Sequence, residues 1–143
     1  MLYKDFLKIE RECPFCEKTN RIIKEEDNAF LTYSLAPYHK HHLLVVPTRH
    51  TEFFEDLNDD ETKSIEKLLH FGVKILKSLG YKDYTILVRN GENLGKSVRH
   101  LHYHIVPVAL IGDVDHKGYE REIMTEKEIE ILMNEFKVAE EKI

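Results

Sequence analysis

Residues 59–79 form the longest helix that the hydrophobic pattern of the chain predicts. Asn58 precedes them as an N-cap candidate, with Glu61 at the spacing of a capping box. Gly80 suits the position just after a helix end, because glycine tolerates a left-handed backbone there. The apolar positions recur at helical spacing and are Ile65, Leu68, Leu69, Val73, Leu76 and Leu79. We therefore expect a long helix with one face buried against a core.

Two shorter helices are expected at the ends of the chain. Residues 1–9 carry apolar side chains on one helical face. Thr125 and Glu128 repeat the capping-box spacing, and apolar residues at helical intervals follow them. The pattern therefore predicts a terminal helix on either side of the central part.

Apolar runs between these helices predict strands. The expected strands cover residues 21–25, 29–33, 43–46, 84–88 and 98–108. Asp27 and Asn28 suit a hairpin turn between the first two, and Pro47 has no N–H with which to continue the third. The sum predicts one α+β domain over residues 1–143, a mostly antiparallel sheet with one long helix packed on it.

Charge and composition narrow the classes of partner. Among 143 residues there are 21 Lys and Arg and 26 Asp and Glu, so the net charge is −5. Such a chain has no general attraction for nucleic acid or for an anionic membrane, so a phosphate ligand must be bound by a local site. No apolar run approaches the roughly 20 residues of a membrane-spanning helix, and residues 1–10 lack a signal-peptide core. We expect a cytoplasmic protein with neither nucleic acid nor membrane as partner.

Histidines are concentrated in two segments of the sequence. Of 9 in the chain, four lie between residues 39 and 50 and three alternate at His100, His102 and His104. On a strand these three would share one face, about 6.6 Å apart from neighbour to neighbour. The outer two would be about 13 Å apart, too far for one zinc ion with bonds of about 2.0–2.1 Å. The three imidazoles must therefore divide between different tasks.

Two cysteines suggest what one of these tasks is. Cys13 and Cys16 stand at the spacing of a metal half-site. A terminal histidine of the alternating set and one from the earlier cluster would complete a tetrahedral zinc site. The residues alone leave open which histidines these are.

A polar loop precedes the alternating histidines. Residues 90–97 contain two glycines, Lys96 and Ser97, and such a loop can hold a phosphate through backbone N–H groups and side chains. A neutral imidazole can attack phosphorus, and the ordinary pKa of histidine near 6.5 leaves it largely neutral at pH 7. These features together favour attack by an imidazole on the phosphorus of a bound phosphate group.

Three segments resemble the histidine-triad (HIT) superfamily. Residues 100–106 resemble its signature, residues 42–50 resemble the strand before its long helix, and Cys-Pro-Phe-Cys at 13–16 resembles the knuckle of its zinc-containing branch. The resemblance implies a five-stranded antiparallel sheet with one long helix and terminal helices, paired as a homodimer. It implies a nucleotidyl hydrolase or transferase for dinucleoside polyphosphates, phosphoramidates or nucleotide sugars, with a purine nucleotide or dinucleoside polyphosphate as ligand.

The resemblance also implies residue roles. His102 corresponds to the nucleophile that forms a nucleotidyl-imidazole, and His104 to the residue that binds the α-phosphate. His42 corresponds to a histidine that orients the triad. One structural zinc per chain would be held by Cys13, Cys16, His50 and His100. The substrate-binding residues would be Ser97, Lys96, Asn90, His42 and Ser34.

Four positions depart from the pattern of that superfamily. Lys96 replaces a common Gln, His41 a common Gly, and Val108 a common Arg. Ser34 stands where relatives have an Asn or Asp that contacts ribose. The family assignment therefore does not define the substrate.

Two other functions fit the same residues. His102 and His104 could bind a second, catalytic metal ion with His39 or His41 as a third ligand. The chain could instead bind a nucleotide without turning it over.

Overall fold

The computed structural model describes residues 1–6, 13–16, 21–91, 98–109 and 121–143. Lys96 and Ser97, and parts of the loop before the triad and of the expected N-terminal helix, lie outside these ranges.

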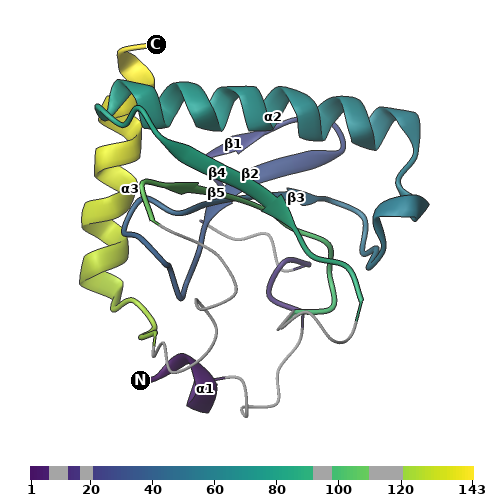
Figure 1. The fold of residues 1–143 in the computed structure, drawn as a ribbon, viewed down its shortest axis with the longest axis horizontal. Coiled ribbons are helices and arrows are strands. Elements are labelled where there is room, and N and C mark those ends of the chain that lie inside the picture. Colours follow the sequence, from purple (N-terminus) through teal and green to yellow (C-terminus); the bar gives the residue numbers. More distant parts are fainter. Residues whose placement is uncertain (7–12, 17–20, 92–97, 110–120) are drawn as a thin grey trace.

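A five-stranded antiparallel sheet forms the centre of the domain (Figure 1). The strands are β1 (Lys24–Glu25), β2 (Ala29–Tyr33), β3 (Leu43–Pro47), β4 (Tyr84–Val88) and β5 (Tyr103–Pro107). Their order in the sheet is β1-β2-β3-β5-β4. The helices are α1 (Tyr3–Phe6), η1 (Phe54–Asp56), α2 (Asp59–Ser78) and α3 (Glu126–Glu141). The predicted α+β architecture is confirmed.

Helix α2 covers one face of the sheet, and α3 packs at one end of it (Figure 1). The α2 helix begins as predicted, because Asn58 and Glu61 form a complete capping box. It ends at Ser78, and Gly80 follows with a φ of 98°. A Cβ at Gly72 would lie 2.6 Å from Ile105 Cδ1, so this glycine allows α2 to approach β5 closely.

The main core lies between α2, α3 and the covered sheet face. It includes Leu31, Leu43, Ile105, Leu76 and Phe136, all fully or almost fully buried. A smaller apolar cluster lies on the opposite face of the sheet. There Phe15 of the cysteine segment (residues 13–16) packs with Phe30, Leu44 and Val46. The histidines of the candidate site lie on this second face, between the sheet and the cysteine segment.

The last strand is shorter than predicted. It starts at Tyr103 rather than Val98, and it ends at Pro107, before Val108, whose φ is 63°. The register pairs Val45 with Tyr103, which would bring Pro47 opposite Leu101. Pro47 has no N–H to donate to Leu101 O. Leu101 N–H donates to Thr51 O at 2.7 Å rather than to Pro47 O, which accepts from His100 Nε2.

The predicted alternation of side chains nevertheless holds beyond the strand. Leu101, Tyr103 and Ile105 all belong to the main core. His100 and His102 contact the Phe15 ring on the other face. The first strand also differs from the prediction, since β1 covers only Lys24–Glu25 and pairs with β2 across the expected turn.

No helix in the described ranges is both long enough and apolar enough to cross a membrane.

Candidate active site and metal cluster

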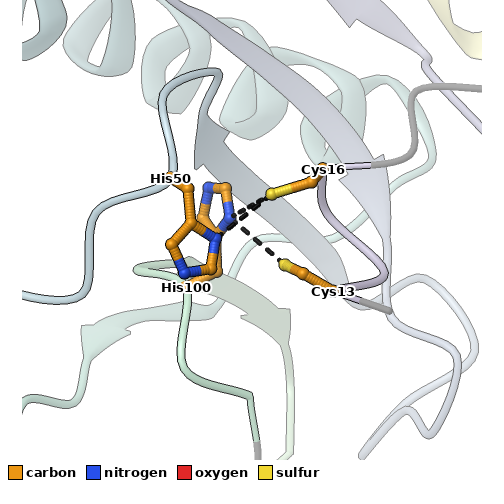
Figure 2. Close-up of side chains that lie close together, drawn as sticks. All are labelled: Cys13, Cys16, His50 and His100. Carbon is orange, nitrogen blue, oxygen red and sulfur yellow. Dashed lines mark hydrogen bonds between the residues drawn. The ribbon is translucent and has the colours of Figure 1, made fainter. Parts of the chain in front are cut away.

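Two cysteines and two histidines converge at one end of the sheet (Figure 2). Cys16 Sγ lies 3.1 Å from His50 Nδ1 and 3.6 Å from His100 Nδ1. Cys13 Sγ lies 3.4 Å from His100 Nδ1. One ligand atom from each of the four residues lies within 4.8 Å of all the others. The expected metal ligands are therefore assembled from three separate segments of the chain.

This donor set fits a tetrahedral metal ion. Zinc bonds of about 2.3 Å to sulfur and about 2.0–2.1 Å to nitrogen give a sulfur–nitrogen separation of about 3.6 Å. The observed sulfur–nitrogen distances run from 3.1 to 3.6 Å. The opposite ring nitrogen of His100, Nε2, donates to Pro47 O at 2.8 Å, so its Nδ1 carries the lone pair. Burial lowers the pKa of His100 and favours this neutral form. The cluster could bind one metal ion.

The other two triad histidines line a cavity. His102 and His104 have ring centroids 4.9 Å apart, and both contribute to the cavity wall. His100 faces the cysteines instead. The three imidazoles therefore lie in two places, and His100 is grouped with the two cysteines and His50.

Hydrogen bonds fix which nitrogen of His104 carries a proton. Tyr38 N–H donates to His42 Nδ1 at 3.2 Å, so neutral His42 holds its proton on Nε2. That Nε2 lies 2.9 Å from His104 Nδ1 and donates to it. His104 therefore carries its own proton on Nε2. It is a neutral hydrogen-bond donor in the cavity wall.

Burial keeps both of these imidazoles neutral. It lowers the pKa of His42 to about 3, with a further contribution from the positive charge of Arg121. Burial also lowers the pKa of His104 well below its ordinary value, with the His42 and His102 imidazoles and Arg89 acting in the same direction. A neutral His42 can accept from Tyr38 N–H at Nδ1 and donate to His104 from Nε2.

The proton of His102 is on Nδ1, whereas that of His104 is on Nε2. The His102 Nδ1 lies 2.8 Å from the backbone carbonyl of His100. A carbonyl only accepts, so Nδ1 is the donor and neutral His102 has its lone pair on Nε2. His102 and His104 thus offer complementary groups at one cavity, an imidazole nitrogen with a lone pair and an N–H donor.

The cavity wall contains residues that sequence reasoning did not find. Three are the arginines Arg21, Arg89 and Arg121, which are far apart in the sequence and belong to no motif. The complete described lining is Tyr3, Phe6, Pro14, Phe15, Arg21, Ser34, Leu35, Ala36, Leu44, Arg89, Val98, His102, His104 and Arg121. An apolar and aromatic wall with convergent cationic groups is typical of a small-molecule anion site.

The expected substrate-binding residues do not all line the cavity. Ser34 lines the cavity, and His42 lies behind His104. Asn90 is outside the described lining, and its Oδ1 accepts from Phe54 N–H at 3.0 Å. Lys96 and Ser97 fall outside the described residues.

His41, which replaces a common glycine, is buried away from this cavity. Its Nε2 donates to Glu135 Oε2 at 2.7 Å, and Tyr81 O–H donates to its Nδ1 at 2.6 Å. His39 Nδ1 accepts from His41 N–H. Within the described ranges, the cysteine–histidine cluster is the one group of His, Cys, Asp and Glu with metal-binding geometry.

The HIT domain family matches this chain over residues 16–109, and the chain belongs to that family. An uncharacterized HIT-like protein of Methanocaldococcus jannaschii is 35% identical over 100 residues, covering 66% of this chain and 78% of that relative. The adenosine 5′-monophosphoramidase of Schizosaccharomyces pombe is 35% identical over 79 residues. That match covers 55% of this chain and 56% of the yeast enzyme.

Solved structures share the fold. The diadenosine triphosphate hydrolase of Plasmodium falciparum, in complex with cyclomarin A, has a TM-score of 0.69 at 20% identity, covering 89% of this chain and 78% of that one. A Zn-bound histidine triad family protein from Mycobacterium smegmatis has a TM-score of 0.61 at 20% identity, covering 92% and 97%.

The buried His42 makes stability depend on pH. Unfolded His42 takes up a proton near pH 6.5, whereas the folded residue does so near pH 3. The free energy of unfolding should therefore fall as the pH falls between these values, by up to about 1.4 kcal/mol per pH unit for this residue. Chemical denaturation across this pH range measures the slope. His42→Gln should reduce it, and His70→Gln on the exposed surface of α2 should not; equal slopes in all three proteins would contradict the assignment.

Proposed function

We propose that the chain is a nucleotidyl hydrolase or transferase that cleaves nucleoside monophosphate conjugates at the α-phosphate. The lone pair of His102 Nε2 attacks phosphorus, and the bond to the leaving group breaks as the phosphorus–nitrogen bond forms. Water or phosphate then attacks the nucleotidyl-imidazole and releases His102. The observation that carries this proposal is the His102 Nδ1 donation to the His100 carbonyl, since it leaves the nucleophilic lone pair on Nε2.

His104 supports the same reaction from beside the nucleophile. Because His104 Nδ1 accepts from His42, the proton of His104 is on Nε2. This Nε2–H can donate to a phosphate oxygen. We assign His42 to orienting His104, and Ser34 to a contact with the nucleotide. Lys96, Ser97 and Asn90 remain our proposed phosphate contacts from the loop before the triad.

The relatives support a nucleotide substrate without choosing its leaving group. One is an adenosine 5′-monophosphoramidase, and one shared fold belongs to a diadenosine triphosphate hydrolase. Both names describe cleavage next to an adenosine nucleotide. A purine nucleotide conjugate, either a phosphoramidate or a dinucleoside polyphosphate, is therefore the substrate class we propose.

We assign one structural zinc per chain to Cys13, Cys16, His50 and His100. A site closed by four protein ligands has no open position at which zinc would activate water. The ion would instead hold the cysteine segment against His100, whose carbonyl accepts from His102. Zinc would thus support the nucleophile through the backbone. Reduced thiolates fit the cytoplasm, which is the location we propose.

We also propose a homodimer formed through β4. This strand is an edge of the sheet, and Ile86 pairs with Ile105 in register. Both residues therefore face the α2 side, yet Ile105 is fully buried while Ile86 is 43% exposed and Tyr84 is 40% exposed. A second copy would cover the apolar edge that α2 leaves open.

Replacing the proposed nucleophile tests the reaction. His102→Ala should lower release of mononucleotide from adenosine 5′-phosphoramidate and from diadenosine triphosphate by about 10³-fold or more. Metal content and unfolding temperature should stay near wild type, and His70→Ala should retain full activity. Turnover retained in His102→Ala would remove it as nucleophile. A wild-type protein that binds these nucleotides but releases no mononucleotide would favour the non-catalytic binding function.

Metal analysis tests the assignment of zinc. Purified protein should contain about one zinc per chain. Cys16→Ser should lose most of it and unfold at a lower temperature, because metal binding contributes to folding free energy. His102→Ala should keep its zinc. About two metal ions per chain, falling to one in His102→Ala, would favour the second, catalytic metal instead.

Light scattering on a sizing column tests the dimer. The wild type should have about twice the 16.9 kDa mass of one chain. Ile86→Lys should shift it toward monomer, because a charge would enter the apolar contact. Ile131→Lys, at an exposed position of α3, should remain a dimer. A wild-type monomer at micromolar concentration would contradict this arrangement.

A further inference from the structure

The loop between β2 and β3 (residues 34–42) determines how His42 is oriented. Tyr38 N–H donates to His42 Nδ1 from within this loop, and this bond keeps the proton of His42 on Nε2. His42 N–H donates to His39 O at 2.9 Å, and the Tyr38 and His42 rings stack with centroids 5.6 Å apart. The donor that His104 presents to the cavity therefore depends on the shape of this loop.

His41 attaches the last turn of the loop to α3 and to the end of α2, beside which the loop lies (Figure 1). Its Nε2 donates to Glu135 Oε2 of α3 at 2.7 Å, and Tyr81 O–H donates to its Nδ1 at 2.6 Å. The ring also packs on Phe136, with centroids 5.5 Å apart, and His41 is only 3% exposed. Both ring nitrogens are engaged in opposite roles, so the imidazole is fixed in one orientation.

The first half of the loop is held by the segment before α3. Leu35 O accepts from Met124 N–H at 3.0 Å, and Ala36 O accepts from Arg121 Nη1 at 2.9 Å. These donors, like α3 itself, follow residues 16–109, over which the HIT domain family matches. The C-terminal segment of this chain therefore supports the loop from outside the matched domain.

A polar anchor at His41 is stricter than apolar packing would be. An apolar side chain could fill the same space in several orientations, whereas a buried imidazole needs a partner in the right direction for each nitrogen. The last turn of the loop is tied to this ring within one residue of His42. Displacing His41 would therefore displace the turn that carries the donor to His42.

Loss of that donor would change the proton positions at the cavity. Without Tyr38 N–H, His42 Nδ1 could carry the proton, and Nε2 would then have none to donate to His104. His104 could then hold its own proton on Nδ1 or turn away from the cavity wall. A donor that is already aimed stabilises developing charge better than one that must first be oriented.

We propose that His41, held by Glu135, is a positioning residue for the reaction proposed above. It acts through the loop, because a fixed His41 keeps Tyr38 N–H on His42, and His42 keeps the proton of His104 on Nε2. The effect on turnover rests on the proposed function. The proton positions are a property of the free protein and can be measured without a substrate.

Nitrogen NMR of the histidine rings in the purified protein tests the positioning. The wild type should show a protonated Nε2 and an unprotonated Nδ1 for both His42 and His104. Glu135→Ala removes the acceptor of His41, so the two nitrogen signals of His42 should move toward each other as its neutral forms interconvert. Glu135→Gln should restore the wild-type pattern, because its amide oxygen can accept the same bond.

Turnover of adenosine 5′-phosphoramidate is the second measurement. Glu135→Ala should lower kcat by about tenfold and change KM by less than about twofold, because the donor of His104 acts most strongly on the transition state. Glu135→Gln should keep most of kcat.

Ser78→Ala is the matched control for a lost α3 contact. Ser78 Oγ donates to Ala139 O at 2.8 Å, a bond between α2 and α3 that does not include the loop. This variant should keep the wild-type kcat and the wild-type proton positions. Circular dichroism checks that each variant is folded.

Several results would overturn the positioning role. Wild-type proton positions or wild-type kcat in folded Glu135→Ala would do so, and so would an equal loss of kcat in Ser78→Ala. A wild type with the proton of His42 on Nδ1 would also do so, even if Glu135→Ala failed to fold. Absence of turnover by the wild type would instead overturn the proposed function, and the spectra alone would then decide the role of the loop.

Discussion

His100 is bonded in three directions, and the rest of the site depends on this. Its Nε2 donates to the Pro47 carbonyl, its Nδ1 faces the two cysteine sulfurs, and its own carbonyl accepts from His102 Nδ1. One residue therefore connects the end of β3, the cysteine segment and the proposed nucleophile. The contact with Pro47 is available because proline has already ended the β3–β5 ladder at this point.

Proton positions in the site follow from backbone groups whose roles are unambiguous. The Tyr38 N–H can only donate and the His100 carbonyl can only accept. Neutral His42 therefore carries its proton on Nε2, and neutral His102 carries its proton on Nδ1. Burial lowers the pKa of His42 and of His104, so neither ring carries a second proton that would change these donor and acceptor roles. The result is a lone pair and an N–H donor side by side, in a cavity whose arginines supply the positive charge.

Much of the fold was predictable because it depends on local patterns. The capping boxes at Asn58 and Thr125 and the glycine after α2 define helix ends through nearby backbone groups. Alternation of apolar residues and histidines correctly separated Leu101, Tyr103 and Ile105 from the triad. The prediction of a strand from Val98 was wrong, since strand assignment needs a partner and the partner here ends in proline. Alternation survived because extended backbone turns successive side chains apart even without a ladder.

The sequence by itself determined the set of chemical groups, which are two thiols at metal spacing and three alternating imidazoles. The spacing along an extended chain also indicated that the three imidazoles cannot all bind one metal ion. The sequence could not say that His100 rather than His104 meets the cysteines, except by family resemblance, because that choice depends on how three distant segments pack. Only the tertiary structure gathered Arg21, Arg89 and Arg121 into one cavity and engaged His41 with Tyr81 and Glu135. Residues separated by many positions in the chain carry no shared period or motif, so their meeting is decided by the packing of the sheet, the helices and the N-terminal segment.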